Sequence, residues 1–149
     1  MSLEISAEIK GLVDGALASG TPMVLASVDA QGRPRLTFRG SIQVFGADAL
    51  GFWARRADGS TMENIAANPF VAMMFRDPSS RAMLQFSGRA RVADGAERER
   101  VYANAPEAER NADAQKAGAG VVVELDRIEG LLGFDADGKP RFVRMTREA

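Results

Sequence analysis

The stretch FWARRADGSTMENIAANP, residues 52–69, places two adjacent arginines just before a Gly-Ser-Thr step at the expected start of a helix. Backbone N–H groups at a helix start, hydroxyl groups and guanidinium groups all donate hydrogen bonds to anions, and together they suit a phosphate. The candidate donors are Arg55, Arg56, Ser60 and Thr61. The same residues also fit a capping box, with Ser60 as N-cap and Glu63 three residues later. The stretch by itself does not separate a phosphate site from ordinary helix capping.

Cysteine and histidine are both absent from the 149 residues, and this restricts the chemistry of the chain. Their absence excludes disulfides, thiolate nucleophiles, Cys/His zinc sites, iron–sulfur clusters, histidine-ligated haem and catalytic triads that use imidazole. We therefore expect no metal site and assign no catalytic residue. Any redox chemistry is expected to come from a bound cofactor.

The overall charge and hydropathy are those of an ordinary globular protein. The net charge is −1, from 19 basic and 20 acidic residues, so no global field favours nucleic acid as a partner. No apolar stretch approaches the roughly 20 residues that a membrane-spanning helix needs, and the N-terminal MSLEISAEIK is too polar for a secretory signal. We predict one domain over residues 1–149, located in the cytoplasm, with neither nucleic acid nor a membrane as partner.

The elements that must position the arginines and hydroxyls are mostly strands. Apolar periodicity and turn residues predict strands over residues 23–28, 35–44, 49–55, 70–75, 82–92, 121–134 and 140–145. Helices are predicted over residues 3–18 and 60–67, and over the charged stretch 96–118, which Pro106 is expected to divide. This order predicts an antiparallel β-barrel with helices at its rim.

Strict alternation along residues 35–44 predicts two different faces. The residues expected to face inward are Leu36, Phe38, Gly40, Ile42 and Val44, and those expected outward are Arg35, Thr37, Arg39, Ser41 and Gln43. Trp53 and Met83 are expected on the outward face of neighbouring strands. Since Trp53 fits poorly against water, we interpret this face as covered, either by a dimer partner or by a ligand. Arg39 is expected on the same side as Arg55, so that three guanidinium groups meet at the helix start.

The chain resembles the flavin-binding split β-barrel family of pyridoxamine 5′-phosphate oxidase, with its general stress protein and deazaflavin-dependent relatives. The segments that carry the resemblance are MVLASVDAQGRPRLTF, LGFWARRADGSTMENIAANPFVAMMF and QFSGRARV. The resemblance implies a mainly β fold with rim helices, an antiparallel split β-barrel, and a homodimer that binds two FMN molecules where the barrels meet. Arg39, Ser60 and Thr61 would hold the phosphate. The flavin ring would lie along the strand from Arg39 through Ser41 to Gln43, near Trp53 and Ala54.

Several positions depart from the pattern of the family. Ser60 and Thr61 stand where relatives commonly carry Arg-Lys or Lys, so Arg55 or Arg56 is expected to replace the lost cation. Ala54 corresponds to a threonine that contacts flavin, and Met83 corresponds to a glutamine. The C-terminal segment of the true oxidases, with its Trp and Arg, has no counterpart, because Trp53 is the only tryptophan. We therefore do not expect pyridoxal phosphate synthesis.

The resulting hypothesis is an FMN-dependent oxidoreductase that acts on an unknown small molecule. One alternative is a reductase that uses the deazaflavin F420, whose acidic tail would suit Arg89 and Arg91. A second alternative is a flavin-binding, stress-related module without turnover. The sequence leaves the substrate, the electron donor and the presence of turnover open.

Overall fold

A computed structural model describes residues 2–148, which form eight strands and four helices. The strands are β1 (Met23–Val28), β2 (Pro34–Arg39), β3 (Gln43–Gly46), β4 (Ala49–Ala54), β5 (Phe70–Asp77), β6 (Ala82–Ala93), β7 (Ala119–Phe134) and β8 (Pro140–Thr146). The helices are α1 (Ala7–Asp14), α2 (Ser60–Ala67), α3 (Gly95–Asn104) and α4 (Glu107–Ala112). The predicted strand 23–28, the helix 60–67 and the division of the charged helix at Pro106 are confirmed.

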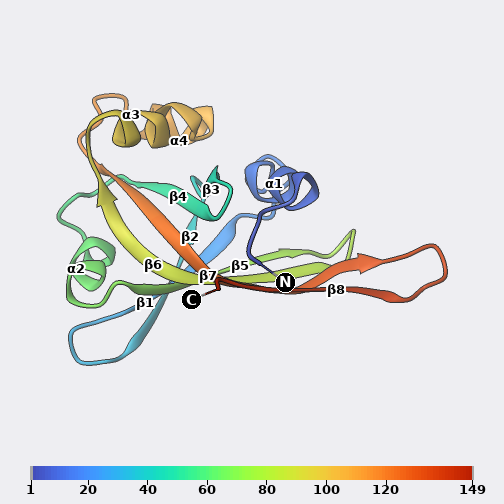
Figure 1. Ribbon diagram of the computed structural model, residues 1–149. Coiled ribbons are helices and arrows are strands. Elements are labelled where there is room, and N and C mark those ends of the chain that lie inside the picture. Colours follow the sequence, from blue (N-terminus) through green and yellow to red (C-terminus); the bar gives the residue numbers. More distant parts are fainter. Residues whose placement is uncertain (1, 149) are drawn as a thin grey trace.

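The strands form one antiparallel sheet in the order β2-β1-β5-β6-β7-β4-β3, and β8 also pairs with β7. The first part of β7 pairs with β4 and its second part pairs with β8. Between these parts the β6–β7 register shifts at Ser87/Gly88, where Asp126 is left as the extra residue of a bulge. In Figure 1 the β5–β6 and β7–β8 hairpins extend together to one side, away from α2, α3 and α4.

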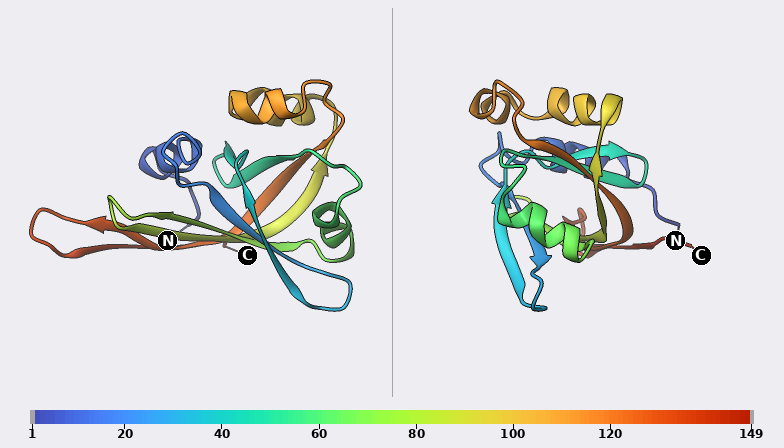
Figure 2. Two further views of the ribbon diagram at one scale, coloured as in Figure 1. Left: turned by 180° about the vertical axis from the view of Figure 1, so that it is seen from behind. Right: turned by 90° about the vertical axis from the view of Figure 1, so that its left-hand side faces the viewer.

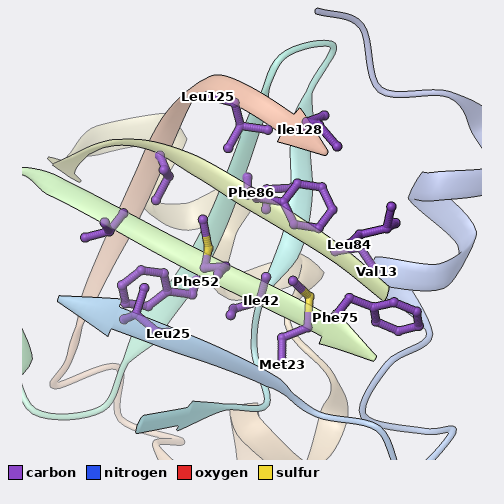
Figure 3. Packing of buried hydrophobic residues seen from close by; sticks show 14 of the residues in the cluster. Val13, Met23, Leu25, Ile42, Phe52, Phe75, Leu84, Phe86, Leu125 and Ile128 are labelled. Carbon is purple, nitrogen blue, oxygen red and sulfur yellow. The ribbon is translucent and has the colours of Figure 1, made fainter. Parts of the chain in front are cut away.

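The main core lies on the inner face of the curved sheet. Leu25, Met73, Phe86, Ile128 and Met145 occupy consecutive paired positions across five strands, so their side chains share this face. Figure 3 shows apolar side chains from several strands converging there, with Val13 of α1 closing one side. Each large side chain fully buried in this way contributes about 1.5–3 kcal/mol to the stability of the fold.

A second apolar cluster lies on the opposite face of β4 and β7, beneath α3. Figures 1 and 2 place α3 and α4 together over this part of the sheet, while α2 lies beside β1. Trp53 packs edge-on against Tyr102 of α3, with ring centroids 5.0 Å apart and an interplanar angle of 75°. Trp53 was predicted to be covered by a dimer partner or by a ligand. The structure shows instead that helix α3 of the same chain packs on this face of Trp53.

The predicted strand 35–44 is wrong in two respects, because it is two strands and the faces of its first part are reversed. The chain leaves the sheet after Arg39 and re-enters at Gln43. Leu36 and Phe38, expected inside, are 75% and 70% exposed. Arg39 is paired with Met23, a core residue, so its side chain starts on the inner face at the rim of the sheet. Alternation shows which residues share a face, but strand pairing decides which face is buried.

Past the break, the side chains that were expected to face outward are also buried. Ser41 and Gln43 are 1% and 3% exposed, while Ile42 joins the main core. The predicted helix 3–18 is shorter than expected: Ser6 caps α1 by accepting a hydrogen bond from the backbone N–H of Ile9 at 3.2 Å. No helix in residues 2–148 is both long and apolar enough to cross a membrane.

Candidate functional site

A cavity of about 530 Å³ lies at the rim of the sheet, between the end of β2, the end of β4 and the start of α2. Seven of the ten residues predicted for the site line it: Arg39, Ser41, Trp53, Arg55, Arg56, Ser60 and Thr61. The three arginines therefore meet the start of α2 at one cavity. The strand pairing that brings them together differs from the expected pairing, because β3, and not the strand that contains Arg39, pairs with β4.

Arg39 is the most constrained cation of the cavity. Its Nη2 donates a hydrogen bond to Thr61 Oγ1 at 2.6 Å, and its guanidinium carbon lies 5.7 Å from the centre of the Phe52 ring. Burial lowers the pKa of Arg39; the Glu109 carboxylate opposes this shift and the Arg55 guanidinium adds to it. The buried Nε has no hydrogen-bond partner among the described residues. An unpartnered buried donor next to a cavity fits an anionic ligand that supplies the missing acceptor.

The start of α2 is open to a ligand because no side chain caps it. Gly59, not Ser60, is the N-cap residue, and no side-chain hydrogen bond satisfies the first N–H groups. The predicted capping box of Ser60 and Glu63 is therefore wrong. Ser60 begins the helix itself and its side chain is exposed at the cavity. Free N–H groups and the positive end of the helix dipole both favour an anion at this point.

An acidic side chain that was not predicted also lines the cavity. Glu109 of α4 accepts hydrogen bonds from Arg55, with Arg55 Nη2 at 3.2 Å from Oε2 and 3.3 Å from Oε1. The Glu109 side chain is 13% exposed, against 54% for Arg55. Glu109 follows Arg55 by 54 residues and belongs to a stretch that reads as a solvated charged helix. Only the tertiary structure brings it to the arginines.

Ser41 and Trp53 line the cavity but are also held by the protein itself. Ser41 Oγ accepts a hydrogen bond from the backbone N–H of Trp53 at 2.9 Å and donates to its carbonyl oxygen at 3.0 Å. The indole Nε1 of Trp53 donates to Asp113 Oδ2 at 2.8 Å. Both residues therefore form a rigid wall of the cavity, whatever ligand it takes.

The remaining predicted residues lie elsewhere in this chain. Ala54 is buried in the main core beside Trp53. Gln43 donates to the carbonyl oxygen of Val101 at 3.0 Å and borders a separate polar hollow with Lys10 and Asp14. Met83 is 49% exposed and lines an apolar groove with Phe142, away from the arginines.

The cavity also includes two residues that were not predicted for the site. These are Phe38 and Gly40, which alternation had assigned to the interior.

Comparison with known proteins identifies the family of the chain. Residues 9–130 match the family model described as pyridoxamine 5′-phosphate oxidase. The chain belongs to this family. A curated relative, the pyridoxine/pyridoxamine 5′-phosphate oxidase of Pseudomonas savastanoi pv. phaseolicola, is 29% identical over 111 residues, which are 74% of this chain and 50% of that protein. The chain thus spans about half the length of the curated relatives that it matches.

Solved structures of other proteins share the split-barrel fold of this chain. An FMN-binding protein from Nostoc punctiforme related to pyridoxamine 5′-phosphate oxidase superimposes with a TM-score of 0.64 at 11% identity, covering 92% of this chain and 93% of its own. A haem-binding protein from Mycobacterium smegmatis superimposes with a TM-score of 0.66 at 18% identity, covering 92% of this chain and 57% of its own. Since similar backbones belong to proteins named for different ligands, the ligand must be argued from the cavity.

Proposed function

We propose that this chain binds FMN through its phosphate at the arginine-lined cavity and functions as a flavin-dependent oxidoreductase of a small molecule. The observation that carries the proposal is the unpartnered Arg39 Nε beside the uncapped start of α2. A phosphate monoester would accept a hydrogen bond from each, and Arg55 and Arg56 would add charge-assisted contacts. FMN combines such a phosphate with a redox-active ring, and an FMN-binding protein shares the fold.

The amino-acid composition indicates which chemistry the cofactor would supply and which role the protein would have. Bound FMN would supply hydride and electron transfer, which the chain, having neither cysteine nor histidine, is not equipped to perform by itself. Arg39 and the start of α2 would hold the phosphate, and the rigid wall of Ser41 and Trp53 would orient the rest of the molecule. The substrate is proposed only as a small molecule that reaches the ring.

The proposed assembly is a homodimer. Leu36 and Phe38 of β2 are exposed, and their pairing partners Ala26 and Val24 extend the same apolar face onto β1. Phe38 also lines the cavity, so this outer face adjoins the proposed phosphate site. A partner chain seated on β2 would therefore lie close to the cofactor and shield it from water.

The contacts of Arg89 and Arg91 give the deazaflavin alternative little support. Arg91 donates to Glu97 and Glu124, and Arg89 lies 3.6 Å from Asp126. Neither arginine lines the cavity. An acidic tail of F420 would therefore have to compete with carboxylates that already neutralise these cations.

Titration with FMN and riboflavin, which differ only in the phosphate, tests the proposal, and titration with F420 tests the deazaflavin alternative. Protein freed of any copurified flavin is titrated with FMN, riboflavin and F420, and binding is followed by flavin fluorescence. We expect FMN to bind more tightly than riboflavin by at least tenfold, because a hydrogen bond to a charged group contributes about 1.5–3 kcal/mol. Equal affinities for FMN and riboflavin would contradict the phosphate site, and tighter binding of F420 would favour the deazaflavin alternative. Bound FMN that NADH, NADPH and reduced partner proteins all fail to reduce under anaerobic conditions would favour the module without turnover.

A further inference from the structure

Glu109 is unusual because it places a negative charge inside a cavity otherwise suited to an anion. Its carboxylate contacts Arg55 through both oxygens, and its side chain is 13% exposed. It also lies against the end of β2: a Cβ atom placed on Gly40 would stand 2.5 Å from Glu109 Oε1. A residue with a side chain at position 40 would therefore displace this carboxylate.

The position of the carboxylate overlaps with the position that a phosphate needs. Glu109 is paired with Arg55 and is also the acidic group whose charge acts on Arg39. An anion that accepts hydrogen bonds from Arg39 and Arg55 must share these cations with Glu109 or replace it. Two like charges at such a site repel each other by an amount that rises as water is excluded.

We propose that Glu109 is the internal counter-ion of the cavity, a specificity-determining residue that competes with a ligand's phosphate for Arg55 and sets how strongly the phosphate contributes to binding. The proposal rests on the proposed function, because FMN is taken as the phosphate-bearing ligand. Without a ligand, the carboxylate neutralises part of the repulsion among the three arginines. With a ligand, it disfavours anions whose phosphate does not fully replace it on Arg55.

The helix that carries Glu109, α4, is suited to the replacement of this carboxylate by a phosphate on Arg55. Helix α4 has six residues and none of them is buried. Apart from Glu109, its contacts to the rest of the fold include the Arg110 carbonyl oxygen, which accepts a hydrogen bond from the Tyr102 hydroxyl at 3.1 Å, and the Arg110 side chain, which donates to the Ala103 carbonyl oxygen at 3.2 Å. Glu109 is thus free to leave Arg55 without breaking a packed core.

The test compares Glu109→Gln with the wild-type protein for one ligand with a phosphate and one without. Removing the charge is expected to tighten FMN binding roughly tenfold and to leave riboflavin affinity unchanged, since only the phosphate meets the carboxylate. Glu107→Gln is the matched control, because Glu107 lies on the same helix, is exposed and does not line the cavity. In a parallel measurement without flavin, inorganic phosphate should raise the Tm of Glu109→Gln more than that of the wild-type protein.

The possible outcomes separate this inference from the proposed function. Unchanged or weaker binding of FMN and phosphate by Glu109→Gln, or an equal gain for riboflavin, overturns the role of Glu109 even if wild-type protein binds FMN well. Wild-type protein that does not prefer FMN to riboflavin counts against the proposed function. In that case a larger phosphate-induced Tm shift in Glu109→Gln than in wild type still supports the counter-ion role of Glu109. The absence of a larger shift overturns that role. Far-UV circular dichroism establishes that each variant is folded.

Discussion

Arg39 connects the edge of the sheet to the start of α2 through its hydrogen bond to Thr61. Its guanidinium group is partly buried, and one of its nitrogen atoms still lacks a partner among residues 2–148. Leaving a buried donor unsatisfied costs about 1–3 kcal/mol, which a bound phosphate would recover. The residue therefore couples ligand binding to the stability of the site.

Arg39→Ala is expected to weaken FMN binding by about 1.5–3 kcal/mol, the range for a hydrogen bond to a charged group. The measurement is the Kd from quenching of flavin fluorescence. Arg35→Ala is the matched control, because Arg35 lies on the same strand but its guanidinium pairs with Asp29 and does not line the cavity. Equal losses in the two variants would point to general electrostatics and remove Arg39 from the phosphate site.

Ser60→Ala separates the two interpretations of the Gly-Ser-Thr step. Because Ser60 does not cap α2, its removal should change the free energy of unfolding by less than about 0.5 kcal/mol, as for other exposed side chains. FMN affinity should nevertheless fall, since the hydroxyl lines the cavity. Urea denaturation and FMN titration of one preparation measure both quantities, and a loss of stability near 1 kcal/mol would restore the capping role.

At the scale of the elements, Asp113 organises the turn between α4 and β7. Its carboxylate accepts hydrogen bonds from Trp53 Nε1 and from the backbone N–H groups of Ala117 and Gly118, at 2.8–3.0 Å. Partial burial acts to raise the pKa of Asp113, but these hydrogen bonds outweigh it and lower the pKa. The turn therefore depends on the ionised carboxylate, and it anchors the Trp53 wall of the cavity.

Asp113→Asn is expected to destabilise the protein by about 1.5–3 kcal/mol at pH 7, because the N–H groups lose a charged acceptor. The folded-state pKa is lower than the unfolded value of about 3.9, so the stabilisation is fully present above that value and is lost as the pH falls through the folded-state pKa. Urea denaturation across this range should show the difference between wild type and variant shrinking with acidification. Asp137→Asn, at an exposed position in the β7–β8 turn, should show no comparable effect.

At the scale of the whole molecule, the sheet leaves an apolar surface uncovered beside its charged cavity. Leu36 and Phe38 are the most accessible apolar residues of β2, which stands at the end of the strand order. Exposed apolar patches next to a binding cavity are typical of protein interfaces. This arrangement supports the proposed homodimer, in which the outer face of β2 would be buried.

If the protein forms the proposed homodimer, Leu36→Asp is expected to convert it to a monomer, because a carboxylate would be buried without a partner at the interface. Light scattering coupled to size-exclusion chromatography should give twice the 15.9 kDa chain mass for wild type and one chain mass for the variant. The unfolding free energy of the monomer should change little, since Leu36 is 75% exposed. Val92→Asp, exposed near the start of α3, is the control, and a wild-type protein that is monomeric at all concentrations would contradict the proposal.

The sequence by itself determined the local elements and the residue types of the cavity. Turn residues and alternation located β1, β5, β6 and α2, Pro106 divided the charged helix, and the arginines near Ser60 indicated an anion site. Only the tertiary structure decided which face of β2 is buried, that α3 covers Trp53, that Gly59 rather than Ser60 is the N-cap residue of α2, and that Glu109 lies among the arginines. The physical reason is that alternation and propensity are local, whereas burial depends on strand pairing and on packing between residues distant in the chain.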